Sequence, residues 1–108
     1  MTILTAETFD DFIRSNHIVF VDFWAPWCGS CKGFAKILER VESMQSVEYN
    51  KPKVEFAKVD VGDAPDIADR YSITSLPTVV LFSESQPVMK EVGAMPQQRI
   101  EAILRGLV

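Results

Sequence analysis

One apolar segment, and the residues that end it, constrain the fold of this chain more than any other feature. The segment from Ile18 to Trp24 is β-branched or aromatic at nearly every position, which is typical of a central strand covered on both faces. Pro26 and Gly29 then break the strand, and apolar residues recur beyond them at helical spacing. A buried strand that turns directly into a helix indicates a sheet with helices packed against it.

The rest of the chain alternates helix-like and strand-like segments. We predict helices over residues 6–15 (with Thr5 as the cap), from Cys28 or Gly29 to 44, over 65–71, and from Pro96 to Leu107. We predict strands over 54–61, 78–82 and 88–92, with an edge strand at Ile3 and Leu4, a loop over 45–53 and a turn over 83–86. This order predicts parallel pairing in the first half and an antiparallel hairpin at the end. The expected fold class is α/β, a mixed sheet of four to five strands with helices on both faces, formed by residues 1–108 as one domain.

Charge and hydropathy exclude several classes of function. Lys and Arg total 11 and Asp and Glu total 15, which gives a formal net charge of -4. Nucleic acid and anionic membrane surfaces both require a basic face, so we expect neither as a partner. The longest apolar run, Ile18 to Val21, is far shorter than the ~20 residues of a membrane span. The first residues lack the pattern of a signal peptide, and we therefore expect a cytoplasmic protein.

The two cysteines, Cys28 and Cys31, lie where the predicted strand gives way to the helix. Free backbone N–H groups and the positive end of the helix favour thiolate over thiol there, and the thiolate is the nucleophile. The spacing places both sulfurs on one helical turn. Cys28 is therefore the candidate to attack a substrate disulfide, and Cys31 the candidate to resolve the mixed disulfide.

Three other readings of these residues compete with the catalytic one. A structural disulfide at this spacing would close too short a loop to constrain the unfolded chain. A structural zinc site needs four ligands, and the chain offers only the two cysteines and His17, so we expect no metal. Asp22 is the candidate base for Cys31, because burial raises the pKa of a carboxyl group. The alternative for Asp22 is a carboxyl group that is merely satisfied by a local hydrogen bond. Lys58 either points to the surface or pairs with Asp22.

Four segments resemble the thioredoxin family, and they occur in the order that the family shows. Val21-Asp22-Phe23-Trp24-Ala25-Pro26-Trp27-Cys28-Gly29-Ser30-Cys31-Lys32 is similar to its active-site signature. Further on, Phe56-Ala57-Lys58-Val59-Asp60, Ile73-Thr74-Ser75-Leu76-Pro77-Thr78 and Val92-Gly93-Ala94 resemble its buried-lysine strand, its cis-proline segment and its last glycine turn. The resemblance covers nearly the whole chain and implies the thioredoxin fold.

The resemblance also implies a role for each matching residue. Cys28 would be the exposed nucleophile, Cys31 the resolving thiol, and Asp22 with Lys58 the buried pair that handles protons. Pro77 would be cis, and the backbone of Leu76 would pair with an extended substrate segment. Substrate contacts would come from Trp27, Gly29, Ser30, Leu76, Pro77 and Gly93. The chain would need no bound cofactor, act as a monomer on protein disulfides, and be recharged by an NADPH-dependent thioredoxin reductase.

Ser30 departs from the family pattern, because typical thioredoxins have proline between the cysteines. A serine hydroxyl can donate to the Cys28 thiolate, so we expect a more oxidising pair than in a typical thioredoxin. The leading function is that of a disulfide reductase. An oxidase or isomerase of the protein-disulfide-isomerase kind, and a binding module that uses the fold as a docking platform, are the alternatives.

Overall fold

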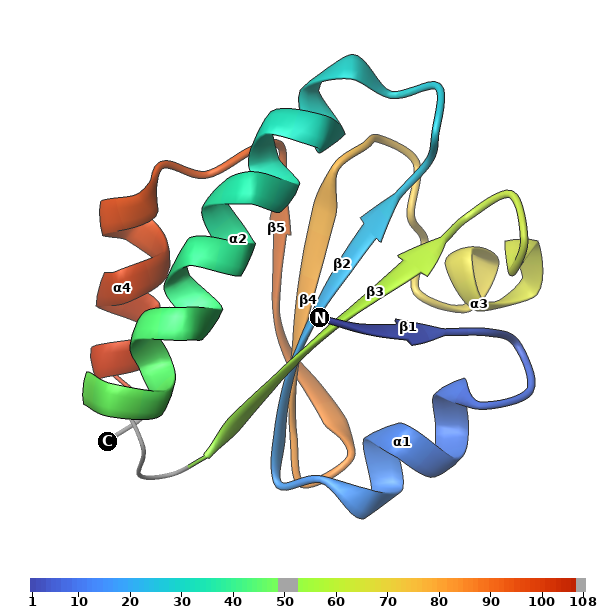
Figure 1. Cartoon of the computed structure of the whole chain (residues 1–108). Helices are drawn as coiled ribbons and strands as arrows, with labels where there is room; N and C mark the ends of the chain where they lie inside the picture. The colour runs from blue at the N-terminus through green and yellow to red at the C-terminus, as the bar shows by residue number, and fades with distance from the viewer. Residues whose placement is uncertain (49–52, 107–108) are drawn as a thin grey trace.

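A five-stranded mixed sheet lies at the centre of the computed structural model, which describes residues 1–48 and 53–106 (Figure 1). The strands, in the spatial order β1-β3-β2-β4-β5, are β1 (Thr2–Leu4), β2 (Ile18–Trp24), β3 (Val54–Asp60), β4 (Thr78–Ser83) and β5 (Gln86–Val92). The helices are α1 (Phe9–Ser15), α2 (Gly29–Glu48), α3 (Pro65–Arg70) and α4 (Gln97–Arg105). The pairs β1–β3 and β2–β3 are parallel, whereas β2–β4 and β4–β5 are antiparallel. The predicted mixed sheet and the edge strand at Ile3 and Leu4 are therefore confirmed.

Both faces of the sheet are covered, as the apolar run in β2 predicted. Along β2, Ile18 and Phe20 face a core formed with α2 and α4, where Phe34 and Ile100 are fully buried. The alternate residues of β2 face a second core formed with α1 and α3, which includes Phe9 and Ile67. Side chains of a strand point alternately to opposite faces, so a strand buried on both faces must be apolar throughout. Asp22 breaks this rule, and it lies on the same face as α2 by this alternation.

The first helix begins later than predicted, at Phe9 instead of Ala6. Thr5 and Thr8 exchange hydrogen bonds: the Thr5 N–H donates to Thr8 Oγ1 (2.9 Å) and the Thr8 N–H donates to Thr5 Oγ1 (3.2 Å). This reciprocal pair closes a turn before the helix, and the Phe9 N–H donates to the Thr5 carbonyl oxygen (3.0 Å). Thr5 therefore acts at the start of the helix, as expected, but one turn upstream of its first residue.

The second helix is longer than predicted. It begins at Gly29, as the sequence indicated, and runs to Glu48, so the predicted loop is wrong over residues 45–48. Those residues include neither proline nor glycine, and the first breaker beyond them is Pro52, which lies outside the described residues together with 49–51. The last helix ends at Arg105, and Leu107 also lies outside the described part. No helix within the described ranges is long and apolar enough to cross a bilayer.

A two-residue turn at Glu84 and Ser85 joins β4 to β5. β5 begins at Gln86, two residues earlier than predicted, because Phe82 pairs with Pro87 while Leu81 pairs with Met89. This shift in register is a bulge, a position at which a strand tolerates proline. Glu84 and Ser85 have φ angles of 52° and 69°. These angles lie in the left-handed region, in which residues other than glycine and asparagine are strained.

Replacing Glu84 and Ser85 by Asn and Gly is therefore expected to stabilise the protein by about 1 kcal/mol, because these residues adopt the required angles with little strain. The midpoint of urea unfolding at constant m-value measures the change. Ser83→Gly, one residue earlier in β4, is the control and should destabilise the protein. Equal or lower stability of the Asn-Gly variant would contradict this account of the turn.

Candidate active site

Cys28 and Cys31 form a disulfide at the start of α2. Their Cα atoms lie 5.4 Å apart, as the spacing on one turn requires. Backbone bonds hold this turn: the Cys28 N–H donates to the Ala25 carbonyl oxygen (3.1 Å), and the Cys31 N–H donates to Cys28 Sγ (3.3 Å). Cys28 is 8% exposed and Cys31 1%. The exposed nucleophile implied by the resemblance is thus nearly buried, and it differs from its partner only in degree.

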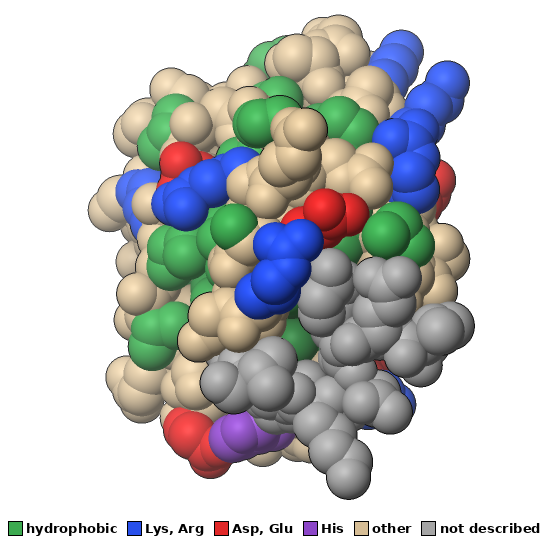
Figure 2. Space-filling model, turned by 90° about the vertical axis from the view of Figure 1, so that its left-hand side faces the viewer, with side chains coloured by type: hydrophobic (Ala, Val, Ile, Leu, Met, Phe, Trp, Pro, Cys, Tyr) green, Lys and Arg blue, Asp and Glu red, His purple; other side chains and the backbone are tan. Residues whose placement is uncertain are grey.

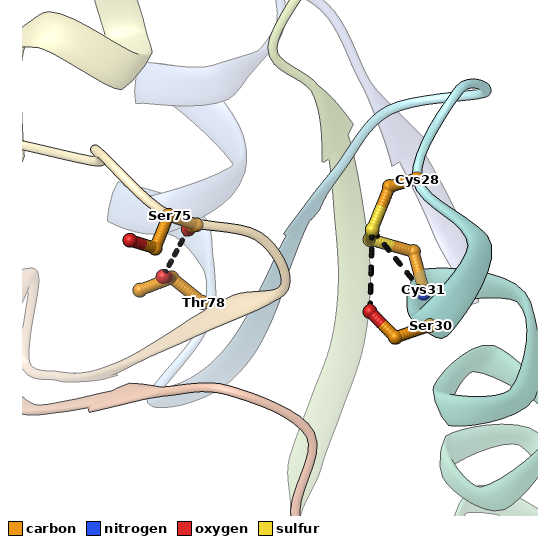
Figure 3. Close-up of a disulfide and its surroundings, with 5 residues drawn as sticks. All are labelled: Cys28, Ser30, Cys31, Ser75 and Thr78. Atoms are coloured by element: carbon orange, nitrogen blue, oxygen red, sulfur yellow. Dashed lines mark hydrogen bonds between the residues drawn. A yellow bond between two sulfur atoms is a disulfide. The ribbon is translucent and has the colours of Figure 1, made fainter.

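The Ser30 hydroxyl lies beside the disulfide, with its Oγ 3.6 Å from Cys28 Sγ (Figure 3). Because neither sulfur of a disulfide carries a proton, the hydroxyl is the donor in this state. The Cys31 N–H and the Ser30 O–H therefore converge on Cys28 Sγ, and Cys31 Sγ has no such pair of donors among the described residues. Such donors bind a charged thiolate more strongly than a neutral sulfur.

Asp22 is the candidate proton acceptor for the cysteine pair. Its side chain is 1% exposed, and neither carboxylate oxygen has a hydrogen-bond partner within the described structure. With Cys31 it lines a cavity of about 230 Å³. Burial raises the pKa of Asp22 from 3.8 to about 7, and the nearby charge of Lys58 opposes part of that rise. The carboxyl group can therefore take up and release a proton near neutral pH.

Lys58 points inward, towards the same cavity, which decides between the two orientations that the sequence left open. It lies opposite Asp22 in the parallel β2–β3 pair, and its Nζ is 5.1 Å from the centroid of the Trp24 ring. Lys58 and Asp22 are near enough to interact through space, yet the described contacts include no ion pair between them. The ammonium group is held partly by the face of the indole ring.

The segment before β4 contains two of the predicted substrate contacts, Leu76 and Pro77. The Leu76–Pro77 peptide bond is cis, as the resemblance implied. Thr78 is fully buried, and its hydroxyl donates to the Ser75 carbonyl oxygen (2.6 Å), which closes a short loop. Figure 3 shows that the chain between Ser75 and Thr78 bulges towards the disulfide. The Gly93 N–H donates to the Pro77 carbonyl oxygen (2.8 Å), and its φ of 95° favours glycine at this position.

The remaining predicted residues lie around this centre or away from it. Trp27 is 76% exposed beside Cys28, and Gly29 starts α2 with open space around its Cα. Leu76 is half-buried and Pro77 is buried. His17 is exposed and contacts Glu84 at the hairpin, away from the cysteines. Within residues 1–48 and 53–106, no three His, Cys, Asp or Glu side chains are grouped so that they could hold a metal ion.

Two residues of the site were not singled out from the sequence. Trp24 lines the Asp22 cavity, and its buried indole N–H has no partner within the described residues. The signal was its position two residues after Asp22, because residues two apart on a strand share a face. Thr78 closes the loop before β4, and its place directly after a proline gave no indication that its hydroxyl would be buried and bonded.

Comparison with known proteins adds independent information. The family model described as Thioredoxin matches residues 1–106. A thioredoxin from Alicyclobacillus acidocaldarius is 37% identical over 105 residues, covering 97% of this chain and 95% of that one. A bifunctional thioredoxin reductase/thioredoxin from Mycobacterium leprae is 41% identical over 102 residues, covering 94% of this chain and 20% of that protein. The structure of Plasmodium falciparum thioredoxin matches with a TM-score of 0.87 at 29% identity, covering all of both chains.

Proposed function

The chain belongs to the thioredoxin family of thiol–disulfide oxidoreductases, and from this premise we propose that it reduces disulfide bonds in other proteins. The observation that carries the proposal is the Cys28–Cys31 disulfide at the start of α2, with the carboxyl group of Asp22 in a cavity beside Cys31 and without a hydrogen-bond partner among the described residues. A reversible disulfide next to a buried group that titrates near pH 7 is suited to exchange electrons and protons with a substrate.

The reaction proceeds in two exchanges. In the first, the Cys28 thiolate attacks one sulfur of the substrate disulfide, and the other substrate sulfur leaves as a thiolate. In the second, Cys31 attacks Cys28 Sγ in the mixed disulfide, and the first substrate sulfur leaves. The substrate gains two electrons and two protons, and the protein ends with the Cys28–Cys31 disulfide that the structure contains.

Asp22 acts in the second exchange. The Cys31 thiol must lose its proton to become a nucleophile, and at 1% exposure it has little access to water. Asp22 and Cys31 line the same cavity, so the carboxylate is placed to accept that proton directly or through a water molecule. Lys58 has a positioning role, because its charge keeps part of the Asp22 population ionised at neutral pH.

Substrate docks on the surface around Cys28. Trp27 offers a large exposed aromatic face, and the loop that contains Leu76 and the cis Pro77 bulges towards the disulfide. The backbone of Leu76 pairs with an extended substrate segment in the manner of an added strand, and Gly93 borders the same surface. Gly29 and Ser30, on the first turn of α2, complete it.

The oxidised protein requires a source of electrons. We propose a thioredoxin reductase that draws on NADPH, since a reductase and a thioredoxin are parts of one protein in Mycobacterium leprae. The chain itself then needs no bound cofactor, because the cysteine pair carries both electrons. A pair that must be kept reduced fits a reducing compartment, and on this ground we assign the protein to the cytoplasm.

Reduction of insulin, followed by the precipitation of its free B chain, tests the proposed function. With dithiothreitol as electron source, the wild-type protein should accelerate the reaction strongly, and Cys28→Ser should not exceed the rate of dithiothreitol alone. A second assay replaces dithiothreitol by NADPH and a purified bacterial thioredoxin reductase. Equal rates for wild type and Cys28→Ser in the first assay would contradict the proposal.

Ser30 tunes the potential of the pair. Its hydroxyl is positioned to stabilise the Cys28 thiolate, which favours the reduced form and makes the pair more oxidising. Ser30→Ala and Ser30→Pro should therefore both become more reducing by about 20 mV, corresponding to about 1 kcal/mol for a two-electron couple. Titration in dithiothreitol buffers, followed by tryptophan fluorescence, measures the shift. An unchanged or more oxidising potential in both variants would rule out this role, whereas a strongly oxidising wild type would favour the oxidase or isomerase alternative.

A further inference from the structure

The positive side chains of this acidic chain differ in whether they contact a carboxylate. Five contact a carboxylate: Arg14 with Asp11, Lys53 with Glu55, Arg70 with Asp10, Arg99 with Glu91, and Arg105 with Glu101. Lys90 donates to the backbone oxygens of Tyr71 (3.1 Å) and Ser72 (2.7 Å), and Lys58 lies over Trp24. Apart from Lys51, which lies outside the described residues, three cations remain: Lys32, Lys36 and Arg40.

These three residues, which we call the α2 basic strip, share one side of a single helix. They are exposed and spaced at i, i+4 and i+8, which places them one above another along α2. Within the described structure, the Arg40 side chain bonds only the neutral amide of Gln97 (2.9 Å). Figure 2 looks onto the side of the molecule that carries α4 and α2, and Lys and Arg side chains project together at its upper right. The strip is thus a local concentration of positive charge on a protein of net charge -4.

The strip begins at the disulfide. Lys32 follows Cys31 directly and lines the same cavity as Asp22 and Lys58. From Cys31 to Arg40 the helix rises about 13 Å, at 1.5 Å per residue. An extended peptide spans that distance with about four residues. A substrate segment that enters beside Cys28 therefore reaches the strip within a few residues of its own cysteine.

The charges can act only at this short range. At 0.1 M salt the field of an exposed charge is screened within about 10 Å. A substrate segment next to the α2 basic strip is therefore attracted by the cations of the strip, and negative charges farther away on the protein affect it little. Glu39 lies between Lys36 and Arg40 in sequence and is exposed, yet no ion pair joins it to either cation in the described structure. It reduces the field of the strip without cancelling it.

We propose that the α2 basic strip selects substrate proteins that carry acidic residues close to the reducible cysteine. This inference rests on the proposed reductase function and adds a substrate class to it. Acidic side chains four or so residues from the cysteine are attracted to Lys36 and Arg40 in the encounter complex, which raises the rate of the first exchange. A phosphate-rich polymer is a poorer fit, because the protein as a whole repels polyanions and the strip offers few charges.

Two disulfide-bridged peptides that differ only in one segment test the proposal. One carries four glutamates beside a cysteine and the other four glutamines, and each is reduced in a single turnover by pre-reduced protein. The wild type should reduce the glutamate peptide about fivefold faster than does Lys36→Gln/Arg40→Gln. Both proteins should reduce the glutamine peptide equally fast. The difference should largely disappear between about 10 mM and about 500 mM sodium chloride, as screening shortens from about 30 Å to about 4 Å.

Arg14→Gln/Arg105→Gln is the matched control, because it changes the net charge by the same amount at cations that are already paired. It should leave the rate on the glutamate peptide close to that of the wild type, and Glu39→Gln should raise that rate. Equal rates for wild type and Lys36→Gln/Arg40→Gln on the glutamate peptide, or an equal loss in the control, would overturn the proposal. A wild type that reduced neither peptide would overturn the proposed function itself.

Discussion

A Cys31→Ser variant is expected to stop halfway through the reaction and to accumulate a covalent complex with its substrate. Cys28 keeps the two donors that converge on its sulfur, the Cys31 backbone N–H and the Ser30 hydroxyl, and neither depends on the side chain at position 31. The first exchange therefore proceeds. The second fails, because a serine hydroxyl remains protonated at neutral pH and is a poor nucleophile towards a disulfide. Turnover should fall by roughly three orders of magnitude or more.

Non-reducing electrophoresis after incubation with a disulfide-bonded protein shows the complex, and dithiothreitol should separate its two proteins by reducing the mixed disulfide. Cys28→Ser is the control, since a variant without the attacking sulfur should form no complex although Cys31 is present. The opposite pattern, a complex with Cys28→Ser but not with Cys31→Ser, would exchange the roles of the two cysteines. The two variants therefore assign the attacking sulfur, which exposure separates only slightly, at 8% for Cys28 against 1% for Cys31.

Asp22→Asn is expected to stabilise the oxidised protein at pH 8 by about 4 kcal/mol. Burial raises the pKa of Asp22 from 3.8 to about 7, and each unit of such a shift corresponds to 1.36 kcal/mol. Below pH 4 the carboxyl group is protonated in both the folded and the unfolded chain. Between pH 4 and 7 only the folded chain holds the proton, so the free energy of unfolding falls as the pH rises. Above pH 7 the full cost of the buried charge is present.

The asparagine variant lacks this titration, so its advantage should vanish below pH 4, grow through pH 7 and then stay constant. Urea unfolding at several pH values measures it, and Asp66→Asn, an exposed position in α3, should show no comparable trend. The same variant should resolve mixed disulfides more slowly, because Cys31 loses its proton acceptor. A stability difference independent of pH would show that the folded carboxyl group titrates in its ordinary range.

The sequence predicted those features that depend on local pattern. The apolar run of β2 and the breakers Pro26 and Gly29 placed the cysteines at the start of a helix, and Asp22 stood out because it interrupts that run. The features that local pattern did not predict depend on partners distant in the chain. Lys58 lies opposite Asp22 only through the register of β2 against β3, and the cis state of Pro77 was implied by resemblance alone. The late start of α1 reflects the bonds between Thr5 and Thr8, which helical propensity does not capture.

The order of strands in the sheet has a consequence for the protein during its synthesis on the ribosome. Cys28 and Cys31 are synthesised early, whereas β4, which pairs with β2, and Gly93, which follows β5, are made later. Until β4 docks against β2, the segment that contains Pro77 has no fixed place beside the disulfide. A growing chain therefore carries both thiols before the surface proposed to dock substrate is complete, and we expect efficient exchange with protein substrates only when the final third of the molecule completes the sheet.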